Sequence, residues 1–168
     1  PWDSEKLWQI MFRGNFFPPG VVYSSAIAAI DIALWDIAGQ VAKQPIYNLL
    51  GGKCREKIRT YNTAGQYGEN TDSIDAILSP VKLANSLMDE GINAMKWAYT
   101  DHFADQTRGN YISDEDLNLL VKPIKKIRKE IGYNFEIAND GHGRWNLSSA
   151  IKIGKALDQY NILWQEEL

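Results

Sequence analysis

Three side chains in the second half of the chain have types and spacing that could do chemistry: Asp140, His142 and Glu166. Asp140 and His142 lie in the stretch 139–145, which follows an extended-looking run over 133–138. Glu166 follows a second such run, over 162–164. The carboxyl ends of neighbouring parallel strands share one edge of a sheet, where α/β enzymes keep their chemistry. Because hard divalent cations prefer carboxylate oxygens, this spacing predicts half of a divalent-metal site.

Taken alone, these residues leave other interpretations open. Asp140-Gly141 is a common turn dipeptide. His142 by itself is typical of a solvated loop histidine. Glu166 and Glu167 are adjacent, so only one of them can face the predicted site, because successive side chains of a strand point to opposite faces.

The segments that would position these side chains alternate between strand and helix patterns. The order is a strand over 57–61, a helix over 72–89 with Pro80 near its start or at a kink, and a strand over 91–99. A polar loop over 100–113 and a helix capped by Ser113 or Asp114 come next. The strand before Asp140, a helix from about Leu147 and the strand before Glu166 follow. Such alternation predicts a parallel sheet with right-handed crossovers. A small open sheet and the first half of a (β/α) barrel, which usually needs ~250 residues, both fit this pattern.

The first fifty residues show helical patterns and no strand pattern. A short helix through about Phe12 is followed by a Pro-Pro-Gly break at 18–20. The next helix, capped by Ser24 or Ser25 and ending near Val41, is apolar nearly all round, which predicts burial among other helices. A short helix over 46–50 stops at the two glycines 51 and 52.

Composition excludes several classes of partner and compartment. The 168 residues are 45% apolar and 23% charged, with a net charge of −3 and no block of basic residues. Nucleic acid and anionic membrane surfaces are therefore not expected as partners, and no apolar run approaches the ~20 residues of a membrane span. The single cysteine, Cys54, cannot form an internal disulfide, so we expect a cytoplasmic protein. The chain begins without Met or a signal peptide pattern, and we expect it to be an internal fragment.

Two helical motifs and three ordered polar residues together resemble a known family. The runs Ala29-Ile-Asp-Ile-Ala-Leu-Trp-Asp-Ile-Ala-Gly-Gln40 and Pro45-Ile-Tyr-Asn-Leu-Leu-Gly-Gly52 look like the helical part of the capping domain of the enolase superfamily, in its mandelate racemase/muconate lactonizing enzyme branch. Lys96, Asp140 and Glu166 fall where that family has its second-strand lysine and its first two metal ligands. The resemblance covers essentially the whole chain.

The resemblance implies an α/β fold: the first half of a TIM-like (β/α)7β barrel, preceded by the helical part of an α+β capping domain. Residues 1–53 would belong to the capping domain, and residues 54–168 would form the first four strands and three helices of the barrel. The third metal ligand and a late-strand histidine base would lie beyond Leu168, so the fragment alone is expected to be inactive.

The sequence Asp140-Gly141-His142 narrows the resemblance to the acid-sugar dehydratases of the galactonate, mannonate and gluconate type. In these proteins a histidine two residues after the metal aspartate is the general acid. Ala98 replaces the second lysine of the Lys-x-Lys pair of racemases, which counts against racemisation by two bases. A racemase, epimerase or cycloisomerase of the same superfamily, or a catalytically incomplete scaffold, remain the alternatives.

The resemblance assigns a role to each residue. Asp140 and Glu166 would bind Mg²⁺, and Lys96 would stabilise the enediolate formed when the proton α to a carboxylate is removed. His142 would protonate the departing β-hydroxyl, and Arg144 would contact the substrate. The expected partner is a small sugar acid, and we expect a homo-oligomer when the protein is full-length.

Overall fold

The computed structural model describes residues 2–65 and 69–168. These residues fall into two compact units, one up to Ile58 and one from Arg59 onward, a few residues after the predicted boundary between 53 and 54. The helices of the first unit are, in chain order, α1 (Ser4–Arg13), α2 (Val21–Ala42) and α3 (Ile46–Leu49).

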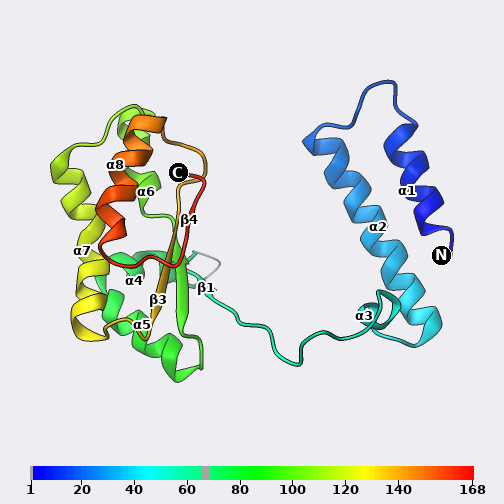
Figure 1. Ribbon diagram of the computed structural model, residues 1–168, viewed down its shortest axis with the longest axis horizontal. Helices are drawn as coiled ribbons and strands as arrows, with labels where there is room; N and C mark the ends of the chain where they lie inside the picture. The colour runs from blue at the N-terminus through cyan, green and yellow to red at the C-terminus, as the bar shows by residue number, and fades with distance from the viewer. Residues whose placement is uncertain (1, 66–68) are drawn as a thin grey trace. The chain divides into compact units, whose positions relative to one another are not determined.

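The first unit is built on α2. Both α1 and α3 pack against α2, as the right-hand part of Figure 1 shows. Trp8 and Phe12, one turn apart on α1, stack with ring centroids 4.8 Å apart. The prediction that Ser24 or Ser25 caps α2 is wrong, because the helix begins at Val21 and the Ser25 hydroxyl donates to the Val21 carbonyl inside it.

Within its own unit, α2 buries only a narrow stripe of its surface against other helices. Its buried residues are Ile27, Ala38 and Gly39, whereas burial nearly all round was predicted. The reason is that α1 and α3, both much shorter, are its packing partners in the unit. By length and composition α2 could cross a membrane, which corrects the expectation that no apolar run approaches such a length; core helices of soluble proteins pass the same test.

The second unit is a parallel sheet with helices on one of its faces (Figure 1). Its strands follow one another in the order β1-β2-β3-β4, and each described neighbour pair is parallel. The elements are β1 (Asn62–Thr63), α4 (Asp72–Leu78), α5 (Pro80–Asp89), β2 (Ala94–Trp97), α6 (Thr100–Thr107), α7 (Asp114–Glu130), β3 (Glu136–Asp140), α8 (Leu147–Asp158) and β4 (Gln165–Glu166). The predicted parallel sheet with helical crossovers is confirmed.

Several predicted boundaries are wrong. Strands β1, β3 and β4 all lie a few residues closer to the C-terminus than predicted, because the residues that pair with neighbouring strands follow the predicted runs or overlap only their ends. The segment predicted as one helix over 72–89, with Pro80 near its start or at a kink, is two helices that meet at Ser79. Pro80 begins the second of them, since it cannot continue the hydrogen bonding of the helix before it. The predicted polar loop over 100–113 begins with a helix, α6.

A hydrophobic core lies between the sheet and its helices. The side chains pointing from β2 and β3 to the helices include Met95, Trp97 and Ile137, all nearly inaccessible to solvent. Helices α7 and α8 contribute the residues Leu120, Ile124, Ile127, Ile153 and Leu157, each 0% exposed. At roughly 1.5–3 kcal/mol for each fully buried aliphatic side chain, this layer holds the sheet in the register that positions the polar residues at its edge.

The N-terminus of α7 carries the cap that the sequence indicates. The Ser113 side chain accepts from the backbone N–H of Asp116, and the Asp116 carboxylate accepts from the backbone N–H of Ser113, which is a capping box. The cap therefore fixes the point at which the connection from β2 through α6 ends and α7 begins. The predicted start of α8 at Leu147 is also confirmed, with Asn146 as its cap.

Candidate metal and acid site

Strand register brings three charged side chains from three strands to one point. Lys96 pairs with Ala138, and Asp140 pairs with Glu166, at the carboxyl ends of β2, β3 and β4. The Lys96 ammonium donates to Asp140 Oδ2 at 2.8 Å and to Glu166 Oε2 at 3.0 Å. The predicted placement of Asp140 and Glu166 at the same end of neighbouring strands is therefore confirmed.

The ionic contacts keep these three groups charged. The hydrogen bond to Asp140 raises the pKa of Lys96 above its ordinary value, in spite of partial burial and with help from Glu166. Burial would raise the pKa of Asp140, but hydrogen bonds from Lys96 and from the His142 backbone outweigh it and hold that pKa below its usual range. Lys96 and the indole of Trp164 lower the pKa of Glu166. The site therefore holds two carboxylates, not carboxylic acids, near neutral pH.

Of the two adjacent glutamates, Glu166 faces the site. Its Oε2 accepts from Lys96 and, at 3.1 Å, from Trp164 Nε1 two residues earlier on the same strand face. The Glu167 side chain is exposed, while its backbone carbonyl accepts from the N–H of Gly143 at 2.7 Å. Glu167 lies just past β4 and has φ +42°, so the chain leaves the extended conformation there and the two adjacent acids are separated.

His142, two residues after the end of β3, is held in an uncommon backbone conformation. Its φ is +48°, a left-handed value that costs a non-glycine residue energy. Its backbone N–H donates to Asp140 Oδ1 at 3.1 Å. The imidazole lies with Nδ1 2.7 Å from Asp101 Oδ2 and Nε2 3.5 Å from Asp140 Oδ2. The hydrogen bond to Asp101 raises the pKa of His142, which partial burial only in part opposes.

Arg144 points away from the three converging charges. Its Nη1 contacts Asp105 Oδ1 at 2.5 Å, and its Nε lies 3.5 Å from Asp101 Oδ2. With Asp105, Ala104 and Arg108 it lines a hollow of about 280 Å³ beside α6. Arg144 is thus beside the site, next to His142, but is not brought into contact with Lys96 or Glu166.

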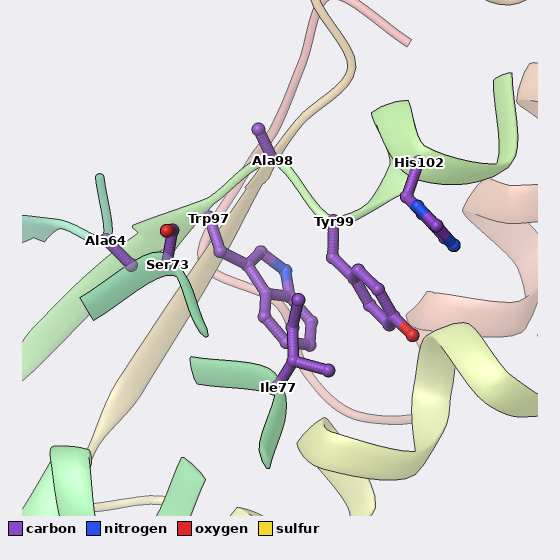
Figure 2. Close-up of a pocket in the computed structure, with 7 residues that line it drawn as sticks. All are labelled: Ala64, Ser73, Ile77, Trp97, Ala98, Tyr99 and His102. Carbon is purple, nitrogen blue, oxygen red and sulfur yellow. The ribbon is translucent and has the colours of Figure 1, made fainter. Parts of the chain in front are cut away.

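The position two residues after Lys96 carries no base. Figure 2 shows Ala98 pointing away from Trp97 and Tyr99, which turn toward Ile77 around a hollow of about 160 Å³ behind the sheet. Because side chains alternate along an extended chain, Ala98 shares the face of Lys96. At this position the face therefore carries a methyl group, which cannot accept a proton.

Two neighbours of the site were not predicted from the sequence. Asp101, the acidic residue in the first turn of α6, was placed in a loop, and its contact with His142 spans 41 residues of sequence. Tyr61, whose ring lies 5.9 Å from Lys96 Nζ and 5.1 Å from the Trp164 ring, was placed in a strand without a role. A Thr-Asp pair followed by Phe103 and Ala104 was the available signal for the start of α6.

The two carboxylates at this site could supply part of the ligand set of a cation. Among residues 2–65 and 69–168 no group of three His, Cys, Asp or Glu side chains is arranged to hold a metal. Asp140 and Glu166 nevertheless present one oxygen each to the same ammonium. Two ionised carboxylates that already converge on one positive charge are a suitable half of an oxygen-ligand shell.

Comparisons with known proteins place this geometry in a family. Residues 2–51 match the family model described as "Mandelate racemase / muconate lactonizing enzyme, N-terminal domain". Residues 80–168 match the family model described as "Enolase C-terminal domain-like". A D-galactonate dehydratase family member from Cellvibrio japonicus is 33% identical over 99% of this chain and 44% of its own length. A D-mannonate dehydratase from Novosphingobium aromaticivorans is 30% identical over the same shares.

A solved structure agrees with the sequence relatives. An enolase of the mandelate racemase subgroup from Agrobacterium tumefaciens is 39% identical, with a TM-score of 0.81 over 98% of this chain and 42% of that one. The chain therefore spans less than half the length of these relatives. The match to residues 2–51 lies in the first compact unit, and the match to residues 80–168 lies in the second, which begins at Arg59. The chain belongs to the mandelate racemase/muconate lactonizing enzyme branch of the enolase superfamily.

Proposed function

We propose that these residues belong to a Mg²⁺-dependent acid-sugar dehydratase that acts on a small sugar acid in the cytoplasm. The observation that carries the proposal is the convergence of Lys96, Asp140 and Glu166, with the His142 imidazole beside them, at the carboxyl ends of three consecutive parallel strands. Relatives named D-galactonate and D-mannonate dehydratase support the substrate class. The second unit would be the first half of a (β/α)7β barrel, whose active site lies at this end.

Asp140 and Glu166 would hold the metal. Mg²⁺ bound there would supply positive charge to the substrate's carboxylate and so lower the cost of forming a carbanion next to it. Lys96, whose pKa is raised, stays protonated and adds a second fixed positive charge on the same face. Because side chains at this edge are partly shielded from water, these charges act more strongly than they would in solvent.

The reaction then needs a base and an acid on two sides of the substrate. A base removes the proton α to the carboxylate, and the electron pair of that C–H bond forms the enediolate. The enediolate electrons form the new double bond as the β C–O bond breaks, and the proton from His142 Nε2 turns the departing hydroxyl into water. With Ala98 on the Lys96 face, the base comes from elsewhere in the protein, and racemisation by two bases on opposite faces is disfavoured.

The test is His142→Asn in the complete product of the gene. We expect β-elimination to fall by about 10²-fold or more, the usual contribution of a general acid, while Mg²⁺ binding and solvent exchange of the α-proton persist. The matched control is His102→Asn, which removes the exposed histidine of α6 that packs against Tyr99. Unchanged dehydration by the His142 variant across a panel of sugar acids would contradict the assignment of the acid.

A further inference from the structure

Asp101 makes the shortest contact to the imidazole of His142 in the described part of the chain, with 2.7 Å between Oδ2 and Nδ1. We propose that Asp101 is a positioning residue, which fixes the ring orientation and the tautomer of His142 so that Nε2 delivers the proton. This inference rests on the proposed function for its role in turnover. Its structural content, that one carboxylate sets the tautomer of one histidine, can be tested separately.

Asp101 is held in place independently of His142. It lies in the first turn of α6, directly after Thr100. The Thr100 hydroxyl donates to the backbone carbonyl of Asp140 at 2.9 Å, and Thr100 is fully buried. The start of α6 is therefore fastened to the end of β3, the strand that precedes His142. The Asp101 side chain is 19% exposed, so its carboxylate has little freedom to leave this position.

The backbone of His142 is fixed from the other side. Its N–H donates to Asp140 Oδ1, and the next residue, Gly143, donates to the Glu167 carbonyl. The side chain itself is 51% exposed, so burial alone would leave the ring free to rotate. The contact with Asp101 is what selects one ring orientation. Arg144 Nε is farther from the same oxygen, at 3.5 Å, and so is the weaker partner of Asp101.

The contact also selects which nitrogen carries the proton in the neutral ring. An ionised carboxylate only accepts hydrogen bonds, so Nδ1 is the donor to Asp101. The proton that the acid gives up must then be the one on Nε2, which lies on the side of Asp140, 3.5 Å from Oδ2. When Nε2 protonates the departing hydroxyl, the C–O bond pair leaves on oxygen, water forms, and the ring becomes the neutral Nδ1–H tautomer that Asp101 stabilises.

The first test measures the tautomer. In the complete protein with ¹⁵N-labelled histidine, at a pH where His142 is neutral, we expect the Nδ1–H tautomer. Its signals are assigned by their loss in His142→Gln. In Asp101→Ala the Nδ1–H preference should be lost. A wild-type His142 that is mainly the Nε2–H tautomer would overturn the inference, whether or not the protein dehydrates any sugar acid.

The second test separates acid delivery from folding. We expect Asp101→Asn to lower kcat for dehydration about 10²-fold with KM within about twofold, because the acid step is impaired and substrate binding is not. Elimination of fluoride from a β-fluoro analogue, which needs no proton on the leaving group, should stay near the wild-type rate, as should α-proton exchange. The control is Asp114→Asn, which removes an exposed first-turn carboxylate paired with Lys152 on a different helix.

The outcomes distinguish the two hypotheses. An unchanged kcat in Asp101→Asn, or an equal loss of dehydration, fluoride elimination and α-proton exchange, would overturn the positioning role. If the wild-type protein eliminates neither water nor fluoride and exchanges no α-proton, the proposed function fails, and the tautomer measurement still decides what Asp101 does to His142.

Discussion

Replacement of Lys96 by Met should make the protein bind Mg²⁺ more tightly while it abolishes turnover. In the structure the Lys96 ammonium occupies the point on which Asp140 and Glu166 converge, 2.8 and 3.0 Å from their oxygens. A cation that binds both carboxylates must first displace the ammonium from them. The Lys96 side chain is 13% exposed and that of Asp140 is 7% exposed, so this contact is poorly screened by solvent.

The size of the effect follows from the contact with Asp140. A hydrogen bond between charged groups contributes about 1.5–3 kcal/mol, and Lys96→Met removes that cost of displacement. Since every 1.4 kcal/mol is tenfold in affinity, the Kd for Mg²⁺ should fall by about 10- to 150-fold. Without metal the same variant should be less stable by about 2–3 kcal/mol, because it leaves a nearly buried carboxylate without its partner.

Calorimetric titration with Mg²⁺, and thermal unfolding with and without a chelator, measure both quantities in the complete gene product. Lys96→Arg keeps the charge and should bind Mg²⁺ much as the wild type does. Lys53→Met removes an exposed ammonium paired with Glu56 and should change neither quantity. If Lys96→Met binds Mg²⁺ no more tightly than the wild type, the ammonium and the metal do not compete for these two carboxylates.

Two further predictions concern Gly109, which packs against the Arg144 backbone, and the titration of His142. Gly109 has φ +71°, and a Cβ there would collide with the Arg144 carbonyl. Gly132 has a similar φ of +79° but open space around it, so Gly132→Ala should lower the free energy of unfolding by only ~1 kcal/mol. Gly109→Ala should lower it by several times that amount. Chemical unfolding of both variants tests this, and equal losses would refute the clash. The pKa of His142 is raised above 6.5 by Asp101. Its contribution to metal-free stability should therefore be complete below about pH 6.5 and be lost as pH rises through the folded pKa, by less than about 1 kcal/mol since the ring is half exposed. His142→Gln should flatten that part of the stability–pH curve, and an unchanged slope would contradict the assignment.

Local sequence was sufficient where the signal lies within one element. The order of strands and helices follows from hydrophobic periodicity, and the cap at Ser113 follows from residue type and spacing. The candidate residues Lys96, Asp140 and Glu166 could be named because each sits at the end of a strand-like run and matches an ordered family pattern. The carboxyl ends of parallel strands meet at one edge, so their proximity was predictable without coordinates.

Helix α6 shows where local sequence is insufficient. Among the eight residues of α6, Phe103 and Ala104 are the buried apolar ones, which is too few for a period of 3.6 to be visible. The helix is stabilised by packing of these two side chains in the core and by the buried Thr100 hydroxyl, bonded to a strand 40 residues away. Such contacts exist only once the sheet has formed.

Residue types and hydrophobic periodicity were enough to predict the family, the parallel α/β order and the charged groups at the strand ends. The folded chain was needed to find that the Lys96 ammonium lies between two carboxylates 44 and 70 residues away, and that Asp101 contacts His142 across 41 residues. The physical reason is that residue type and periodicity are local properties, whereas hydrogen-bond partners are set by strand register and by helix packing over the whole unit. The chemical groups at the site could therefore be listed from the sequence, whereas the contacts between them could be found only in the folded structure.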